Sequence, residues 1–187
     1  MSGAHVAAGL DRLAALASAS KALAPLMARI AQGYVGTLEA GGTLFFCGNG
    51  GSAADAQHMA TEYVVRYARD RRPYPAIALT TDTSLITAAG NDFGFDQIFS
   101  RQVRALAREG DLLVIHSTSG NSPNVLRAAE AARAKGVKVL AFSARDGGAL
   151  KTLADHNVII PTSRTDRAQE LHLCIEHVIC DTVERAL

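Results

Sequence analysis

The sequence predicts an α/β fold in which a central parallel sheet is covered by helices on both faces, and three observations support this prediction. Five short apolar runs are bounded by turn-forming residues, which is typical of strands buried on both faces. Segments with helical spacing of apolar residues separate these runs, and strands that alternate with helices favour a parallel sheet. The length of 187 residues matches one domain, so we expect a single domain over residues 1–187.

The elements follow in a simple order along the chain. Residues 5–40 are rich in alanine and leucine and predict two N-terminal helices, separated or kinked at Pro25. Gly41-Gly42 ends this region, residues 41–162 form the expected core, and a last helix is expected over 166–187. Strands are predicted at 43–47, 76–79, 112–116, 137–142 and 158–160, and the helices between them at 53–67, 84–89, 96–108, 123–135 and 148–153.

The composition excludes several classes of protein. It is 48% hydrophobic and 20% charged, with a formal net charge of +1 and no block of basic residues, so we expect no nucleic-acid partner. We find no apolar run of the length that crosses a bilayer, and the alanine-rich start carries Asp11 and Arg12, so we expect a cytoplasmic protein without a membrane partner. Three cysteines without paired spacing predict buried thiols rather than disulfides. They are Cys47, Cys174 and Cys180.

Residues 44–62 are the most informative stretch. Apolar residues lead into Gly48-Asn49-Gly50-Gly51-Ser52, and Ser52 is predicted to cap the helix that follows. Glycines let backbone N–H groups approach a ligand closely, which favours a phosphate- or sugar-binding loop. His58 and Glu62 are four residues apart and share one helical face, either as a reactive pair or as an ordinary solvated pair.

A second loop, Ser117-Thr118-Ser119-Gly120-Asn121-Ser122, has similar character. It follows the strand at 112–116 and precedes Pro123, which is well placed at the first position of a helix. Four hydroxyls, backbone amides and the positive end of that helix suit a phosphate dianion. Both loops are expected beyond the carboxyl ends of the strands, where ligands bind in such sheets. An ordinary strand-to-helix turn uses the same residue types and remains the alternative.

Two nucleotide-binding motifs fit poorly. Gly48-x-Gly50-x-x-Ala53 matches the glycines of the dinucleotide fingerprint, but the acidic residue expected about 20 positions later is missing, since Asp82 lies too far away. A P-loop is excluded because no Gly-Lys-Ser/Thr follows the glycines.

The two loops, with Gly90-Asn91-Asp92-Phe93-Gly94 and Gln169-Glu170-x-His172-x-x-x-x-His177, resemble the bacterial phosphoheptose isomerases of the sugar isomerase (SIS) family. The resemblance spans nearly the whole chain. It implies a flavodoxin-like three-layer sandwich and a homotetramer with sites at subunit interfaces. It also implies conversion of sedoheptulose 7-phosphate to D-glycero-D-manno-heptose 7-phosphate, for the activated heptose of the bacterial envelope.

The resemblance further implies the site residues. Glu62 and His177 match acid–base positions, and one zinc ion per subunit is implied at His58, Glu62, Gln169 and His177. The matching substrate-binding positions are Asn49, Gly50, Gly51, Ser52, Glu62, Asp92, Ser117, Thr118, Ser119, Ser122 and Gln169.

The chemistry agrees with these residue types. A ketose–aldose conversion moves a proton between adjacent carbons through an enediol, so Glu62 suits the base and a neutral His177 suits the group that polarises the carbonyl. Zinc would instead stabilise the enediolate, and the two accounts compete for Glu62, because a carboxylate that binds zinc is a poorer base. Gln169 and His177 are separated by about 12 Å along one helix, so we expect a neighbouring subunit to complete the site.

Some other residues have a structural explanation, and two other functions remain as alternatives. His116, His172 and Cys174 are expected to be structural. Proteins of the same fold also serve as non-catalytic scaffolds for a replication initiator protein or as phosphosugar sensors. Glu62 together with His177 favours the enzyme over these alternatives.

Overall fold

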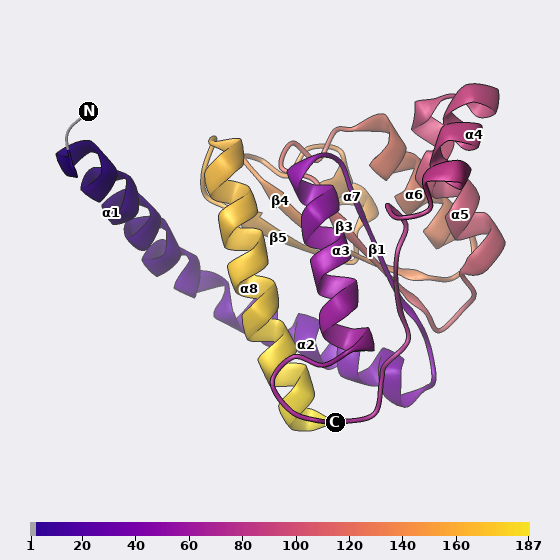
Figure 1. The fold of residues 1–187 in the computed structure, drawn as a ribbon, viewed down its shortest axis with the longest axis horizontal. Helices are drawn as coiled ribbons and strands as arrows, with labels where there is room; N and C mark the ends of the chain where they lie inside the picture. The colour runs from indigo at the N-terminus through magenta and orange to yellow at the C-terminus, as the bar shows by residue number, and fades with distance from the viewer. Residues whose placement is uncertain (1–2) are drawn as a thin grey trace.

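The computed structural model describes residues 3–187, which form one all-parallel sheet of five strands with helices on both faces (Figure 1). The strands lie in the order β2-β1-β3-β4-β5, and each neighbouring pair is parallel. This is the flavodoxin-like order, whose switch point lies between β1 and β3. The predicted α/β fold is therefore confirmed. The strands are β1 Leu44–Gly48, β2 Ala76–Ala78, β3 Leu112–His116, β4 Lys138–Ala144 and β5 His156–Ile160.

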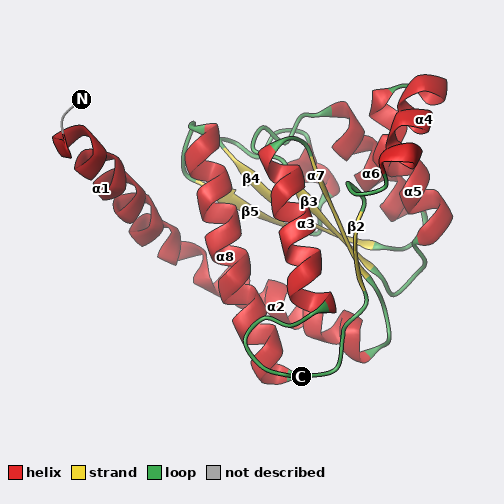
Figure 2. Cartoon of the chain, viewed as in Figure 1, coloured by secondary structure: helices red, strands yellow, loops and turns green. Residues whose placement is uncertain are grey.

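Helices form the two outer layers. Those N-terminal to the sheet, α1 and α2, and the last helix, α8, lie outside the strand-to-strand connections, while the others connect strands or lead into them (Figure 2). The helices are α1 Gly3–Ser20, α2 Ala24–Glu39, α3 Gly51–Val64, α4 Thr83–Phe93, α5 Ile98–Leu106, α6 Pro123–Ala134, α7 Leu150–Leu153 and α8 Thr165–Ala186, with short 3₁₀ helices at Lys21–Leu23 and Phe95–Gln97.

Alternate residues of each strand face two separate cores. Phe46 of β1 packs with residues of α2, α3 and α8, whereas its neighbours Phe45 and Cys47 pack with residues of α4, α5, α6 and α7. Successive side chains of a strand point to opposite faces, so a strand that is apolar throughout is covered on both. As a result, α3 and α8 lie in contact over the same face of the sheet.

Three local predictions were wrong. The edge strand β2 is not buried on both faces, because Ile77 is 41% exposed. Ser52 does not cap α3: Gly50, at φ 57°, precedes the first turn, and Ser52 is buried within it. The prediction of three buried thiols was wrong for Cys174, which is exposed. Cys47 and Cys180 are buried thiols as expected.

The N-terminal helices differ from each other in burial. α2 begins beside Pro25 and contributes Ile30, Tyr34 and Leu38 to the core, while α1 extends away from the body of the molecule (Figure 1). The stretch Gly3–Glu39 is long and apolar enough to cross a membrane by length and composition, so the expectation that no run reaches this length was wrong. This is weak evidence for a membrane, because the core helix of a soluble protein or a signal sequence can meet the same criterion.

Candidate functional site

The two predicted loops meet at the switch point of the sheet. The glycine loop, residues 48–52, follows β1, and the serine loop, residues 117–122, follows the adjacent strand β3, with Gly48 and His116 paired in register. Together with the start of α8 they line one pocket of about 260 Å³. The predicted substrate-binding residues that line it are Asn49, Gly50, Gly51, Ser52, Ser117, Thr118, Ser119, Ser122 and Gln169.

Close backbone contacts and amide pairing fix the glycine loop. A Cβ atom at Gly48 would lie 2.6 Å from the Ser52 carbonyl oxygen, and one at Gly51 would lie 2.7 Å from the Gln169 side chain. The side-chain amides of Asn49 and Asn124 donate to each other at 2.9 and 2.7 Å, which joins this loop to the helix after the serine loop. Glycine is therefore required where α8 and the loop itself approach so closely.

A second group lies further along α3 and α8. His58 and Glu62 of α3 converge with His177 of α8, and their ligand-type atoms all lie within 4.8 Å of one another. His58 Nε2 lies 2.9 Å from His177 Nε2 and 3.3 Å from Glu62 Oε1. One imidazole must accept the shared hydrogen bond, so at least one of the two rings is neutral in this arrangement. We call these three residues the His58 group.

The His58 group fits a zinc ion. Two imidazole nitrogens and one carboxylate form a common catalytic zinc set, which leaves a fourth position for substrate or water. Tetrahedral bonds of about 2.0–2.1 Å place ligand atoms roughly 3.3 Å apart. The separations of 2.9 and 3.3 Å around His58 Nε2 are close to that value.

Gln169 and Asp92 occupy different places from the His58 group. Gln169 lies against Gly51 and lines the loop pocket, and its assignment as a zinc ligand stays a prediction. Asp92 is in the last turn of α4, where it lines a separate pocket with Phe93 and with Arg101 of α5. The structure of one chain therefore does not bring Asp92 to the serine loop, and its substrate contact also stays a prediction.

A buried ionisable pair beneath the site was missed by the sequence interpretation. His116 Nε2 and Glu176 Oε2 lie 2.6 Å apart, and both side chains are almost fully buried. Burial alone would lower the pKa of His116, but the Glu176 carboxylate raises it overall, while burial raises the pKa of Glu176. Across this contact each residue favours the charged form of the other, since His116 lowers the pKa of Glu176 and Glu176 raises that of His116. A glutamate between Ile175 and His177, on the apolar side of the last helix, was the available signal.

Two further ionisable groups lie close to this pair. Asp55, one turn before His58, is 8% exposed, and burial raises its pKa to about 6. His172 is fully buried against the Ser143 carbonyl oxygen at 3.0 Å, and burial lowers its pKa to about 4. His116 and His172 are thus packed within the fold, as expected for structural histidines.

Comparison with known proteins agrees with this geometry. Residues 10–144 match the SIS domain family model. Phosphoheptose isomerase of Rhodospirillum rubrum is 52% identical over 164 residues, covering 88% of this chain and 87% of that protein. The counterpart from Citrifermentans bemidjiense is 53% identical over 165 residues, with coverage of 88% and 86%. The structure of phosphoheptose isomerase from Neisseria gonorrhoeae aligns with a TM-score of 0.92 at 42% identity, covering 97% of each chain.

Proposed function

The chain belongs to the phosphoheptose isomerases of the SIS family, and we propose that it converts sedoheptulose 7-phosphate to D-glycero-D-manno-heptose 7-phosphate through an enediol(ate). It is an isomerase that acts on a phosphosugar. We place it in the synthesis of activated heptose for the bacterial envelope and in the cytoplasm.

One observation carries the proposal: α3 and α8 both begin at the loop pocket and extend to the His58 group. Along α3, Ser52 lies at the pocket and His58 about 9 Å further, and along α8 the step from Gln169 to His177 is about 12 Å. A sugar bound by its phosphate at the serine loop would extend along these helices, with its carbonyl end at the His58 group. In this proposal the 12 Å step separates the two ends of one bound sugar, and completion of the site by a neighbouring subunit stays a prediction.

The side chains then have separate tasks. The hydroxyls and amides of the serine and glycine loops bind the phosphate and hold the sugar in one orientation. Glu62 takes the proton from one carbon and returns it to its neighbour, and a neutral His177 donates to the carbonyl oxygen. Zinc, when bound by the His58 group, would instead polarise the carbonyl as a Lewis acid, and a Glu62 carboxylate that binds the ion would be a poorer base.

The Glu62→Gln variant tests this proposal. Its turnover of sedoheptulose 7-phosphate should fall by about 10²- to 10⁴-fold, because an amide cannot accept the proton. Calorimetry should find phosphosugar affinity largely unchanged, since the phosphate binds at the loops. The matched control is Glu130→Gln, which removes the same charge from an exposed pair with Arg127 on α6 and should leave turnover intact. Normal turnover by Glu62→Gln would remove the carboxylate from the mechanism.

We also propose one zinc ion per subunit, supported by the donor set and spacing of the His58 group. Metal analysis of the purified protein should find about one equivalent of zinc, and a chelator should lower turnover until zinc is restored. His58→Ala should weaken zinc binding in a titration that does not depend on activity. Full turnover by metal-free protein would contradict this role and would favour His177 as the group that acts on the carbonyl.

We also propose that the protein is a homotetramer. The exposed apolar side chains Val6 and Leu10 of α1 support an assembly through the N-terminal helices. A neighbouring subunit could also bring Asp92 to the serine loop, which one chain does not. A monomer that remains fully active would contradict this arrangement. The scaffold and sensor alternatives predict a protein that does not convert the sugar, so the turnover assay separates them from the enzyme.

A further inference from the structure

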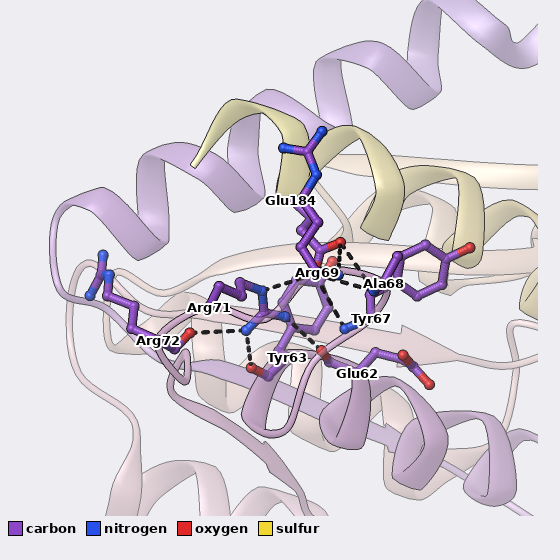
Figure 3. Close-up of polar contacts among 8 residues, drawn as sticks. All are labelled: Glu62, Tyr63, Tyr67, Ala68, Arg69, Arg71, Arg72 and Glu184. Carbon is purple, nitrogen blue, oxygen red and sulfur yellow. Dashed lines mark hydrogen bonds and ion pairs between the residues drawn. The ribbon is translucent and has the colours of Figure 1, made fainter.

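One carboxylate from the end of the chain fixes the loop that follows α3. Glu184, near the end of α8, is 6% exposed, and its side chain accepts hydrogen bonds from the backbone N–H groups of Tyr67, Ala68 and Arg69 at 3.0–3.4 Å (Figure 3). Arg71 Nε donates to the same carboxylate at 3.1 Å. Burial would raise the pKa of Glu184, but these donors lower it overall, so the group is a carboxylate at neutral pH.

Arg71 transmits this contact to the end of α3. Its Nη2 donates to the Glu62 carbonyl oxygen at 2.7 Å, and its Nη1 donates to the Tyr63 carbonyl oxygen at 3.0 Å. Carbonyls in the last turn of a helix lack partners within the helix, and a guanidinium supplies several donors in a fixed plane. Arg71 therefore fixes the backbone of Glu62, the residue whose carboxylate is the proposed base.

The same loop also forms part of the surroundings of His177. The Tyr67 ring lies 5.7 Å from the His177 ring at an interplanar angle of 32°. The Tyr67 N–H is one of the three that Glu184 binds, so the carboxylate sets the position of this ring through the backbone. The backbone of Glu62 and the Tyr67 ring beside His177 are thus both held by one largely buried ion pair.

We propose that Glu184 and Arg71 are positioning residues of the isomerase, which hold Glu62 and Tyr67 in place around His177. The inference rests on the proposed function. Neither residue lines the loop pocket, so their effect belongs to the chemical step more than to phosphate binding. A displacement of about 1 Å at reacting groups can cost on the order of 10²-fold in rate, which makes this support important for turnover.

Two variants test the inference, Glu184→Gln and Arg71→Lys. Glutamine keeps the shape of Glu184 but removes its charge, and lysine keeps the charge of Arg71 but cannot bind two carbonyls and a carboxylate in one plane. Each should lower kcat for sedoheptulose 7-phosphate by roughly 10- to 100-fold, while KM stays within about threefold. Hydrogen exchange of the amides at 67–69 should accelerate in Glu184→Gln.

Asp111→Asn is the control for a purely structural effect. Asp111 is 3% exposed and accepts from the backbone N–H groups of Thr43 and Arg108 at 2.7 and 2.8 Å, beside the amino ends of β1 and β3, which is the end of the sheet opposite to the serine loop. It should lower the melting temperature about as much as Glu184→Gln does, yet leave kcat unchanged. The inference is overturned if Asp111→Asn lowers kcat equally, if Glu184→Gln keeps full kcat, or if its amides exchange at the wild-type rate. If the wild-type protein shows no turnover of sedoheptulose 7-phosphate, the proposed function is wrong. Faster amide exchange in Glu184→Gln would then show that Glu184 holds the loop but does not position groups for isomerisation.

Discussion

Glu176 occupies a position that would be apolar in most amphipathic helices, and its carboxylate lies 2.6 Å from His116 Nε2. Removal of one partner leaves the other buried without its counter-ion, which typically costs about 3–5 kcal/mol, whereas replacement of both by apolar residues is often neutral or favourable. We therefore expect Glu176→Leu to lower the free energy of unfolding by about 3–5 kcal/mol. The double variant His116→Leu/Glu176→Leu should recover most of this loss. Urea unfolding at one protein concentration measures both.

The double-mutant cycle of His116→Leu and Glu176→Leu shows whether the two side chains stabilise each other by their direct contact or each stabilises the fold independently. If the two single substitutions simply add, the side chains contribute independently and the 2.6 Å contact is not the reason for their burial. A coupling energy well above about 0.5 kcal/mol is the expected result for residues in direct contact.

Single residues differ in how far the sequence could predict them. Spacing put His58 and Glu62 on one helical face, and the structure brings them together with His177. No local pattern indicates that Glu176 contacts His116, because their pairing depends on how α8 packs on the sheet and the two residues are 60 positions apart. The pairing of Arg71 with Glu184 also lies outside any local pattern, because the two residues are 113 positions apart in the sequence.

At the scale of elements, the serine loop depends on its contact with the segment before α7. Gly120 has φ +65°, and a Cβ atom there would collide with the Gly147 carbonyl group. Its own carbonyl oxygen accepts from the Leu150 N–H at 2.9 Å, and the Asn121 side chain accepts from the Ala149 N–H at 2.9 Å. These contacts tie the serine loop to the 147–150 turn.

Gly120→Ala should therefore displace the serine loop and weaken phosphosugar binding. We expect KM to rise by at least tenfold, with a smaller change in kcat, because the His58 group lies on other elements. The steady-state kinetics of Gly120→Ala measure both constants. Gly3→Ala is the control, since nothing lies within 4 Å of a Cβ atom at that position and φ is not positive. An unchanged KM for Gly120→Ala would show that the loop tolerates the displacement or does not bind the phosphate.

The sequence predicts the presence of helices and strands more accurately than the residues at which they begin and end. Continuous apolar runs between turn residues indicate strands of a parallel sheet, and the strand at 112–116 was predicted with the bounds of β3. The predicted end of α3 at 67 was wrong, because Arg71 binds carbonyls near the end of the helix and the chain leaves it after Val64. The exposure of β2 follows from its place at the edge of the sheet, which the order of the strands decides and a single strand's sequence does not.

At the scale of the whole molecule, two buried groups give opposite contributions to stability in acid. The pKa of His172 is lowered to about 4 in the folded chain, so between about pH 4 and its ordinary value of 6.5 only the unfolded chain binds this proton. Stability falls as the pH is lowered through this range. The pKa of Asp55 is raised to about 6 from 3.8, so the folded chain binds that proton more tightly, and stability falls as the pH rises through its range.

His172→Gln separates these contributions. Glutamine can still donate to the Ser143 carbonyl oxygen but does not titrate, so the variant should lose less stability than the wild type on acidification. The difference in free energy of unfolding between the two should change by on the order of 1 kcal/mol per pH unit between about pH 6.5 and 4, as expected for one proton. Urea unfolding at several pH values measures it, and Asp55→Asn should show a difference of the opposite sign. A constant difference between wild type and His172→Gln across this range would mean that His172 is protonated equally in both states, and that its burial against β4 does not exclude the charge.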